Sequence, residues 1–75
     1  MRLLAFGRLS HLPLESAVIP ADVTHSNALR TFLGERWPEV NDPGVRLAIN
    51  QVLVHDDVAL SEGDEIAFLP PMSGG

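Results

Sequence analysis

SEGDEIAFLPP, residues 61–71, combines a turn, a strand and a residue that must end that strand, and the rest of the fold is built around it. Residues 61–64 predict a turn in which Gly63 is available for a positive φ. Residues 65–69 are apolar at four of five positions, which predicts a strand. Pro70 lacks a backbone N–H and ends the strand.

A hairpin is predicted earlier in the chain, over residues 45–54. Residues 45–50 alternate, which is typical of a strand that buries one face. Asn50 and Gln51 suit a tight turn, and residues 52–54 predict a short second strand. The expected buried face carries Val45, Leu47 and Ile49, and the opposite face carries Arg46, Ala48 and Asn50.

Two further strands are predicted near the N-terminus. Residues 2–6 are apolar at nearly every position, as in a strand that is covered on both faces. Residues 14–19, closed by Pro20, predict a second strand with a weaker pattern. Their closeness in sequence favours an antiparallel hairpin. We expect the first and last strands, both highly apolar, to be parallel neighbours in the centre of the sheet.

One helix is predicted between the two hairpins. Thr24 or Ser26 can cap its start, and Pro38 stops it. Its buried face follows the i, i+3, i+4, i+7 spacing, at Leu29, Phe32, Leu33 and either Arg36 or Trp37.

The element order β-β-α-β-β, to which residues 52–54 can add a further short strand, predicts an α+β domain over residues 1–70. An extended reactive tail is expected to follow over residues 71–75. The expected arrangement is a β-grasp, with a mixed sheet of four to five strands packed on one main helix. A single helix cannot cover every apolar residue of such a sheet. The uncovered face is therefore either a protein interface or is covered by loops of the chain; its apolar residues are Leu4, Phe6, Ala48, Ala67 and Leu69.

Composition limits the chemistry of this domain. Ten acidic and five basic side chains give a net charge of −5, which disfavours nucleic acid and anionic membranes as partners. No segment is typical of a signal peptide or a transmembrane helix, so we expect a soluble, cytoplasmic protein. The chain has no cysteine and no lysine, which excludes side-chain thiol and Schiff-base chemistry.

No conventional active site is predicted from the side chains. His11, His25 and His55 match no metal-ligand spacing, so no metal site is expected. The serines lie in no nucleophile elbow, and the glycines match no phosphate-binding loop. The terminal carboxylate of Gly75 is the remaining candidate for a reactive group.

The C-terminal residues suit a terminal reactive group. Pro70 and Pro71 should keep the exit from the last strand extended. The four residues after Pro71 then reach roughly 14 Å, at about 3.5 Å per residue. Gly74 and Gly75 have no β-carbon and can enter a narrow channel in another protein. The alternative is a frayed tail without a function.

Several short motifs occur together in this chain. They are AINQ at 48–51, LSEGDE at 60–65, IAFLPP at 66–71 and SGG at 73–75, with LLAFGRL at 3–9 near the start. Together they resemble the family of molybdopterin synthase small subunits, which are ubiquitin-like sulfur carriers ending in Gly-Gly. The segment 10–14 looks shorter than in that family.

The resemblance implies a sulfur-transfer function. An adenylating and sulfurating partner enzyme would activate Gly75 with ATP and convert it to a thiocarboxylate. The carrier would then dock on the large synthase subunit, as part of a heterotetramer, and give its sulfur to cyclic pyranopterin monophosphate. This would form the molybdopterin dithiolene in molybdenum cofactor biosynthesis. The carrier would be the sulfurtransferase's donor subunit, with no stably bound cofactor and no turnover alone.

The resemblance also implies a role for each tail residue. Gly75 would carry the sulfur and Gly74 would give the tip access to the partner's active site. Met72 and Ser73 would line the inserted tail, and the two prolines would set its direction. The expected docking surface comprises Phe6, Phe68 and Leu69.

Other functions remain open at this point. A sulfur carrier for thiamine, tungsten cofactor or cysteine synthesis would use the same mechanism with a different acceptor. A ubiquitin-like protein modifier would instead attach Gly75 to lysines of other proteins. A plain interaction module would have an inert tail.

Overall fold

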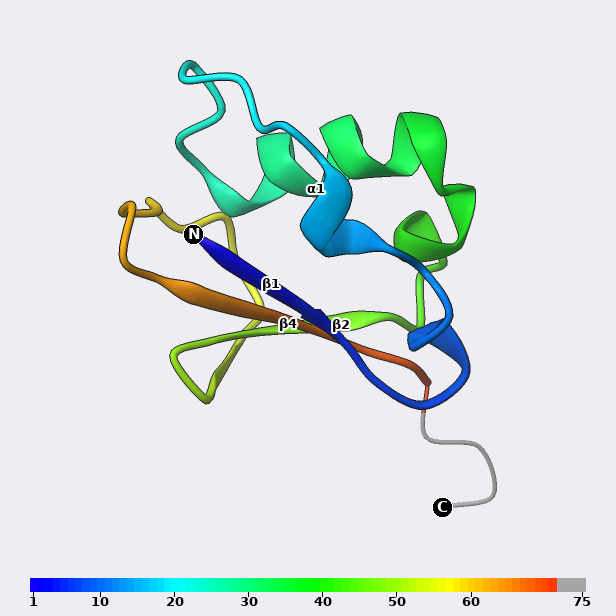
Figure 1. Ribbon diagram of the computed structural model, residues 1–75. Coiled ribbons are helices and arrows are strands. Elements are labelled where there is room, and N and C mark those ends of the chain that lie inside the picture. The colour runs from blue at the N-terminus through cyan, green and yellow to red at the C-terminus, as the bar shows by residue number, and fades with distance from the viewer. Residues whose placement is uncertain (72–75) are drawn as a thin grey trace.

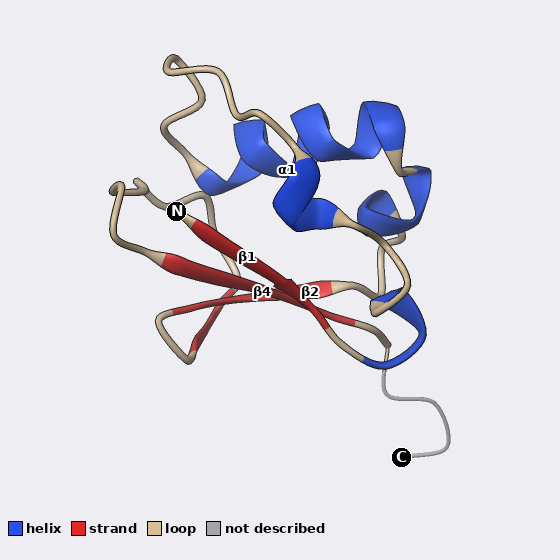
Figure 2. Ribbon diagram, viewed as in Figure 1, coloured by secondary structure: helices blue, strands red, loops and turns tan. Residues whose placement is uncertain are grey.

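The computed structural model describes residues 1–71, in which four strands and one α-helix form two layers (Figures 1 and 2). The elements are β1 (Arg2–Ala5), α1 (Ser26–Arg36), β2 (Arg46–Ile49), β3 (Val52–Val54) and β4 (Glu65–Leu69). The strand order is β1-β4-β2-β3, with β1 parallel to β4 and the other neighbours antiparallel. This confirms the predicted α+β class, the β-grasp arrangement and the mixed sheet on one main helix.

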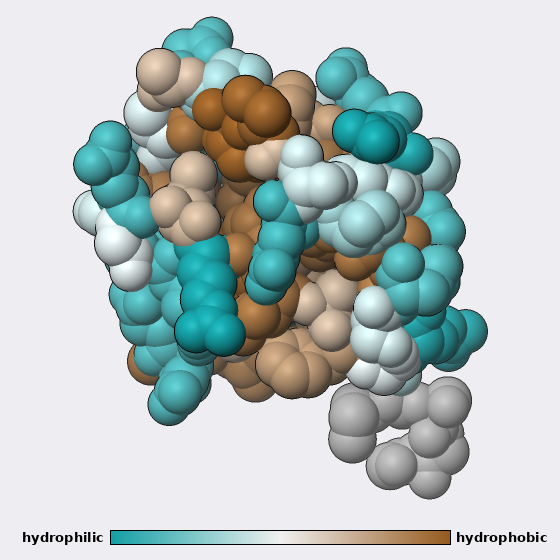
Figure 3. Space-filling view, in the orientation of Figure 1, coloured by the Kyte–Doolittle hydropathy of each residue, from teal (hydrophilic) through white to brown (hydrophobic). Residues whose placement is uncertain are grey.

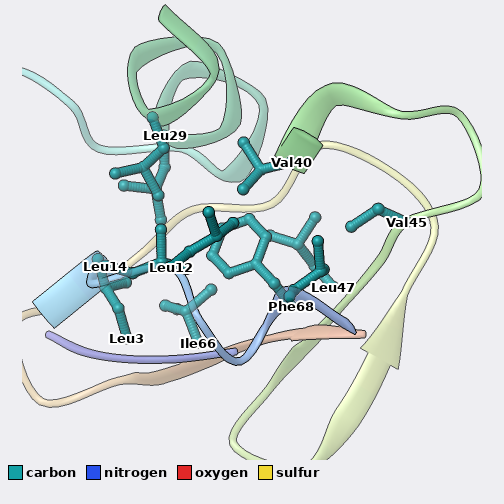
Figure 4. Close-up of a cluster of buried hydrophobic side chains, with 11 residues drawn as sticks. Leu3, Leu12, Leu14, Leu29, Val40, Val45, Leu47, Ile66 and Phe68 are labelled. Atoms are coloured by element: carbon teal, nitrogen blue, oxygen red, sulfur yellow. The ribbon is translucent and has the colours of Figure 1, made fainter. Parts of the chain in front are cut away.

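The core lies between the sheet and α1 (Figure 4). Strand alternation turns Ile66 and Phe68 of β4 toward the helix, where both side chains are fully buried. Leu29 and Leu33, one helical turn apart, cover them from α1. The predicted inner face of β2 is confirmed, because Val45, Leu47 and Ile49 all join this cluster: Val45 and Leu47 are buried, and Ile49 is partly buried.

The strand predicted over residues 14–19 is wrong. A 3-10 helix, Leu14–Ser16, takes its place, and residues 17–20 form no strand. The Ser16 N–H and hydroxyl both donate to the Pro13 carbonyl, at 2.9 and 2.6 Å, so a local turn satisfies the backbone. Leu14 fills the core instead of pairing with a neighbouring strand. The apolar positions of this segment therefore reflect packing in a loop.

The loss of that strand changes the position of β1. Its parallel pairing with β4 is confirmed, with Leu3 opposite Ile66 and Ala5 opposite Phe68. The expectation that β1 is central is wrong, because it lies at the edge of the sheet in the described part of the chain. β4 and β2 are the central strands, and the element order is β-α-β-β-β.

The predicted caps of α1 are also wrong. Ser26 is the first helical residue, and His25 precedes it without a side-chain cap hydrogen bond. The carboxylate of Asp57 acts from a distant loop: its Oδ1 accepts the Asn27 N–H at 2.9 Å and the Ser26 hydroxyl at 3.3 Å. The end of the helix is as predicted, since Pro38 follows the C-cap Trp37 and starts a 3-10 helix (Pro38–Asn41).

The two predicted turns form, but one uses a different backbone conformation. Asn50 and Gln51 have φ values of 52° and 70°, as a two-residue hairpin turn requires. The turn at residues 61–64 closes through the Asp64 N–H and the Ser61 carbonyl, at 3.1 Å. Gly63 does not adopt a positive φ there. Among residues 1–71, Gly7, with a φ of 59°, is the glycine that does so.

Candidate functional site at the base of the tail

β4 carries the chain to the end of the sheet where the tail begins. Leu69, the last residue of β4, and the following Pro70 and Pro71 are all half-buried. Figure 1 shows the end of β4 beside the turn that follows β1. The other predicted tail residues, Met72, Ser73, Gly74 and Gly75, lie outside the described residues. Their roles therefore stay predictions.

The two prolines at the base of the tail each contact a glycine from a different loop. A β-carbon at Gly7 would lie 2.6 Å from Cγ of Pro70. A β-carbon at Gly44 would lie 2.7 Å from Cγ and 2.8 Å from Cβ of Pro71. Such distances are far below a van der Waals contact, so each ring occupies the space that a side chain would need.

The sheet surface opposite α1, called the open face here, is apolar. Register aligns Leu4, Ala67, Ala48 and Leu53 in one row across the four strands. The two central alanines are 7% and 8% exposed, whereas Leu53 at one end of the row is 48% exposed. The large side chains of Leu4 and Leu53 therefore lie at the two ends of the row, and the two small alanines form its centre. An exposed apolar surface of this kind usually marks a site of contact with another protein.

Phe6 and Leu69 extend the open face toward the base of the tail. Phe6 follows β1 in an extended conformation and is 46% exposed. Leu69 pairs with Arg46, whose side chain shares this face. Phe6 and Leu69 are thus accessible for docking, although their role in it stays a prediction. Figure 3 shows the adjoining side of the molecule, where apolar side chains lie over β1 between hydrophilic ones.

Phe68 is not part of this surface, and its predicted docking role is wrong. Its side chain is 0% exposed and contributes to the core under α1. The reason is alternation within β4, which sends Phe68 to the helix side and its neighbours Ala67 and Leu69 to the open face.

Asp64 has a structural hydrogen-bond network at the end of the sheet that carries the 50–51 turn. Its carboxylate accepts the Ser61 N–H at 2.7 Å and the Asn50 side-chain amide at 2.9 Å. These bonds, chiefly the one from the Ser61 backbone, lower the pKa of the Asp64 carboxyl below its ordinary value of 3.8. The Asn50 side chain also accepts the Glu65 N–H at 3.0 Å. The network joins the 61–64 turn to the β2–β3 hairpin.

The remaining surface offers little for side-chain catalysis. Residues 1–71 contain no group of three or more histidine or acidic side chains placed to hold a metal ion. A groove of about 470 Å³ lies between β1 and the 3-10 helix Leu14–Ser16, and Glu15 is its only ionisable lining residue. Within the same described range, no helix is both long enough and apolar enough to cross a membrane.

Sequence reasoning missed three residues near these features. Gly7 and Gly44 contact the prolines, and Asp57 holds the start of α1. The glycines gave a weak signal, because each lies in a loop next to a predicted strand. No sequence pattern pointed to Asp57, since the backbone N–H that its carboxylate accepts belongs to a residue 30 positions away.

Comparison with known proteins gives consistent results. The model of the ThiS family matches residues 3–75. A protein of Escherichia coli (strain K12) named molybdopterin synthase sulfur carrier subunit is 35% identical over 80 aligned positions, covering 100% of this chain and 99% of that protein. A protein of the same name from Haemophilus influenzae is 41% identical over 58 positions, covering 72% of each chain.

Proposed function

The chain belongs to the ThiS family, and on that premise we propose that it is the sulfur-carrier subunit of a molybdopterin synthase. The observation that carries the proposal is the 35% identity with the E. coli sulfur carrier subunit along the whole of both chains. That alignment includes the tail as well as the β-grasp domain. The apolar open face, which Leu69 borders next to Pro70, supports a carrier that works while docked on a partner.

The proposed chemistry takes place at the carboxylate of Gly75. The carboxylate attacks the α-phosphate of ATP in an adenylating partner enzyme, which forms an acyl-adenylate and releases pyrophosphate. The outer sulfur of a persulfide on the partner enzyme then attacks the acyl-adenylate and displaces AMP, which forms an acyl disulfide. A thiol of the partner cleaves the S–S bond of that acyl disulfide, which leaves the Gly75 thiocarboxylate and a disulfide on the partner. The thiocarboxylate sulfur is ionised and nucleophilic. The carrier itself holds no cofactor in this scheme.

The proposed acceptor is cyclic pyranopterin monophosphate in the large synthase subunit. Two sulfur transfers to it build the molybdopterin dithiolene, and each returns Gly75 to a carboxylate. The net charge of −5 supports a substrate site on the partner, because an acidic carrier has few positive groups to bind the phosphate of the pterin. Binding groups for the phosphate would therefore come from the large subunit.

The proposed complex is a heterotetramer of two carriers and two large subunits. The open face, with Phe6 and Leu69, lies against the large subunit. Pro70 and Pro71 aim the tail, while Met72 and Ser73 line it inside the partner. Gly74 lets the tip pass through a narrow channel, since it has no β-carbon.

Reconstitution with a molybdopterin synthase large subunit tests this function. The thiocarboxylated carrier should bind the large subunit and convert cyclic pyranopterin monophosphate to molybdopterin. Deletion of Gly75 should abolish conversion while the domain stays folded, as judged by circular dichroism. A carrier that is thiocarboxylated but neither binds the large subunit nor supports conversion would point to another acceptor pathway.

A further inference from the structure

The positions of Pro70 and Pro71, directly after β4, are constrained by packing. Proline has no backbone N–H, so neither Pro70 nor Pro71 can donate to the sheet ladder. Their rings lie against Gly7 and Gly44 at the close distances given above. Two loops that are far apart in the sequence, around residues 7 and 44, thus contact the consecutive residues Pro70 and Pro71. We call these four residues the glycine seat.

The loop that carries Gly7 is held next to β4. The Phe6 N–H donates to the Phe68 carbonyl at 3.1 Å, two residues before Pro70. The carbonyl of Gly7 accepts the Ser10 N–H at 3.0 Å, which closes the turn that follows. The positive φ of Gly7, 59°, favours glycine at this position independently of the proline.

The loop that carries Gly44 is held by α1. Nε and Nη2 of Arg30 donate to the carbonyls of Val40 and Asp42, at 2.9 and 2.7 Å. The Asp42 carboxylate in turn accepts the Gly44 N–H at 2.8 Å. Gly44 has no positive φ, so its backbone would accept other residues. The proline ring, and not the backbone conformation, is what excludes a side chain there.

We propose that Gly7 and Gly44 are positioning residues that set the direction in which the tail leaves the domain. This inference rests on the proposed function, in which the tip must reach a partner's active site. A rotation of about 10° at Pro71 would move the end of an extended four-residue tail by about 2.4 Å, given its reach of about 14 Å. Misplacement by about 1 Å can lower a reaction rate by about 100-fold.

The test replaces Gly44 by alanine in the full chain, with Gly63→Ala as the matched control. Gly44→Ala adds a methyl group that must displace Pro71, whereas a β-carbon at Gly63 meets nothing within 4 Å. Each thiocarboxylated protein is mixed with excess large subunit, and sulfur transfer is followed in a single turnover. We expect Gly44→Ala to lower the rate constant at saturation by about 10- to 100-fold. Its half-saturating concentration should change by less than about 3-fold, and Gly63→Ala should match the wild type.

A second measurement needs no sulfur transfer. In the free protein, the amide chemical shift and residual dipolar coupling of Met72 should change in Gly44→Ala and not in Gly63→Ala. If Gly44→Ala does not fold, Pro71→Ala serves instead, because it removes the ring that contacts Gly44 and should shift both readouts the same way. A wild-type carrier that delivers no sulfur would contradict the proposed function, while the Met72 signals would still decide the role of the seat.

The inference is overturned by either of two results. One is a folded Gly44→Ala protein with the Met72 signals and transfer rate of the wild type. The other is an equal loss in Gly63→Ala, which would show that any added methyl group in a loop has the same effect.

Discussion

Phe68 and Leu69 are neighbours in β4, yet their side chains point to opposite faces of the sheet. Phe68 is fully buried under α1, and Leu69 borders the open face next to the tail. The alternation of strand residues was visible in the sequence, but which of two adjacent apolar residues faces the helix was not. That choice follows from the register, in which Phe68 lies opposite Leu47 and Ala5.

Alanine substitutions should separate these two roles. Phe68→Ala should lower the free energy of unfolding by about 3–5 kcal/mol, because it leaves a cavity in the core. That loss is comparable with the whole stability of a small domain, so the variant should be largely unfolded. Leu69→Ala should stay folded and weaken binding to the large subunit. Urea titrations measure the stabilities, and a Phe68→Ala protein as stable as the wild type would contradict this packing.

Asp64 predicts a pH dependence of stability. Its carboxyl has a lower pKa in the folded protein than the ordinary value of 3.8, so the folded state favours the ionised form. The resulting stabilisation is fully present above pH 3.8 and is lost as the pH falls through the folded pKa. The thermal midpoints of wild type and Asp64→Asn should therefore differ most above pH 3.8 and converge as the pH falls below the folded pKa of Asp64. A difference that is constant with pH would mean that the charge of Asp64 contributes nothing.

At the scale of elements, local patterns predicted the pieces that depend on near neighbours. α1, β2, β3 and β4 follow from residue periodicity, and the 50–51 turn was predictable from Asn50, a residue type that tolerates positive φ. The positive φ of Gln51 was not predictable from its residue type. The strand prediction for residues 14–19 was wrong because apolar side chains at Leu14 and Ile19 suit a packed loop as well as a strand. The predicted cap of α1 was wrong because the residue that accepts the Asn27 N–H, Asp57, comes from a different part of the chain.

The remote cap of α1 predicts a measurable loss of stability. Asp57→Ala removes the acceptor of the Asn27 N–H and should cost about 0.5–2 kcal/mol, as for other helix N-caps. Asp56→Ala is the matched control, because Asp56 makes no side-chain hydrogen bond among the described residues. Equal stabilities of the two variants in urea titrations would exclude a capping role for Asp57.

The edge position of β1 predicts an alternating pattern of hydrogen exchange. The N–H groups of Arg2 and Phe6 donate to the carbonyls of Asp64, just before β4, and Phe68 in β4, and the parallel ladder directs the N–H of Leu4 toward β4 as well. The N–H groups of Leu3 and Ala5 then point to the free edge. They should exchange at least about tenfold faster than the N–H of Leu4. Equal protection of Leu3, Leu4 and Ala5 would mean that another segment pairs with this edge.

At the scale of the whole molecule, β4 places Pro70 and Pro71, where the tail begins, at one end of the sheet. The fold class was predictable because apolar patterning is local in sequence, whereas the roles of the Pro-Pro and Gly-Gly pairs in the tail stay predictions. The glycine seat was not predictable, because it requires loops around residues 7 and 44 to meet after folding. In the proposed function, the domain positions the tail and the terminal carboxylate of Gly75 reacts.

Intact mass spectrometry tests that assignment most directly. The purified protein is incubated with a family-matched adenylating and sulfurating enzyme, ATP and a sulfur donor, and omission of ATP is the control. The account predicts that one oxygen of the Gly75 carboxylate is replaced by sulfur, only when ATP is present, and that fragmentation places the change on Gly75. An unchanged mass with an enzyme that is active on its own carrier would contradict it.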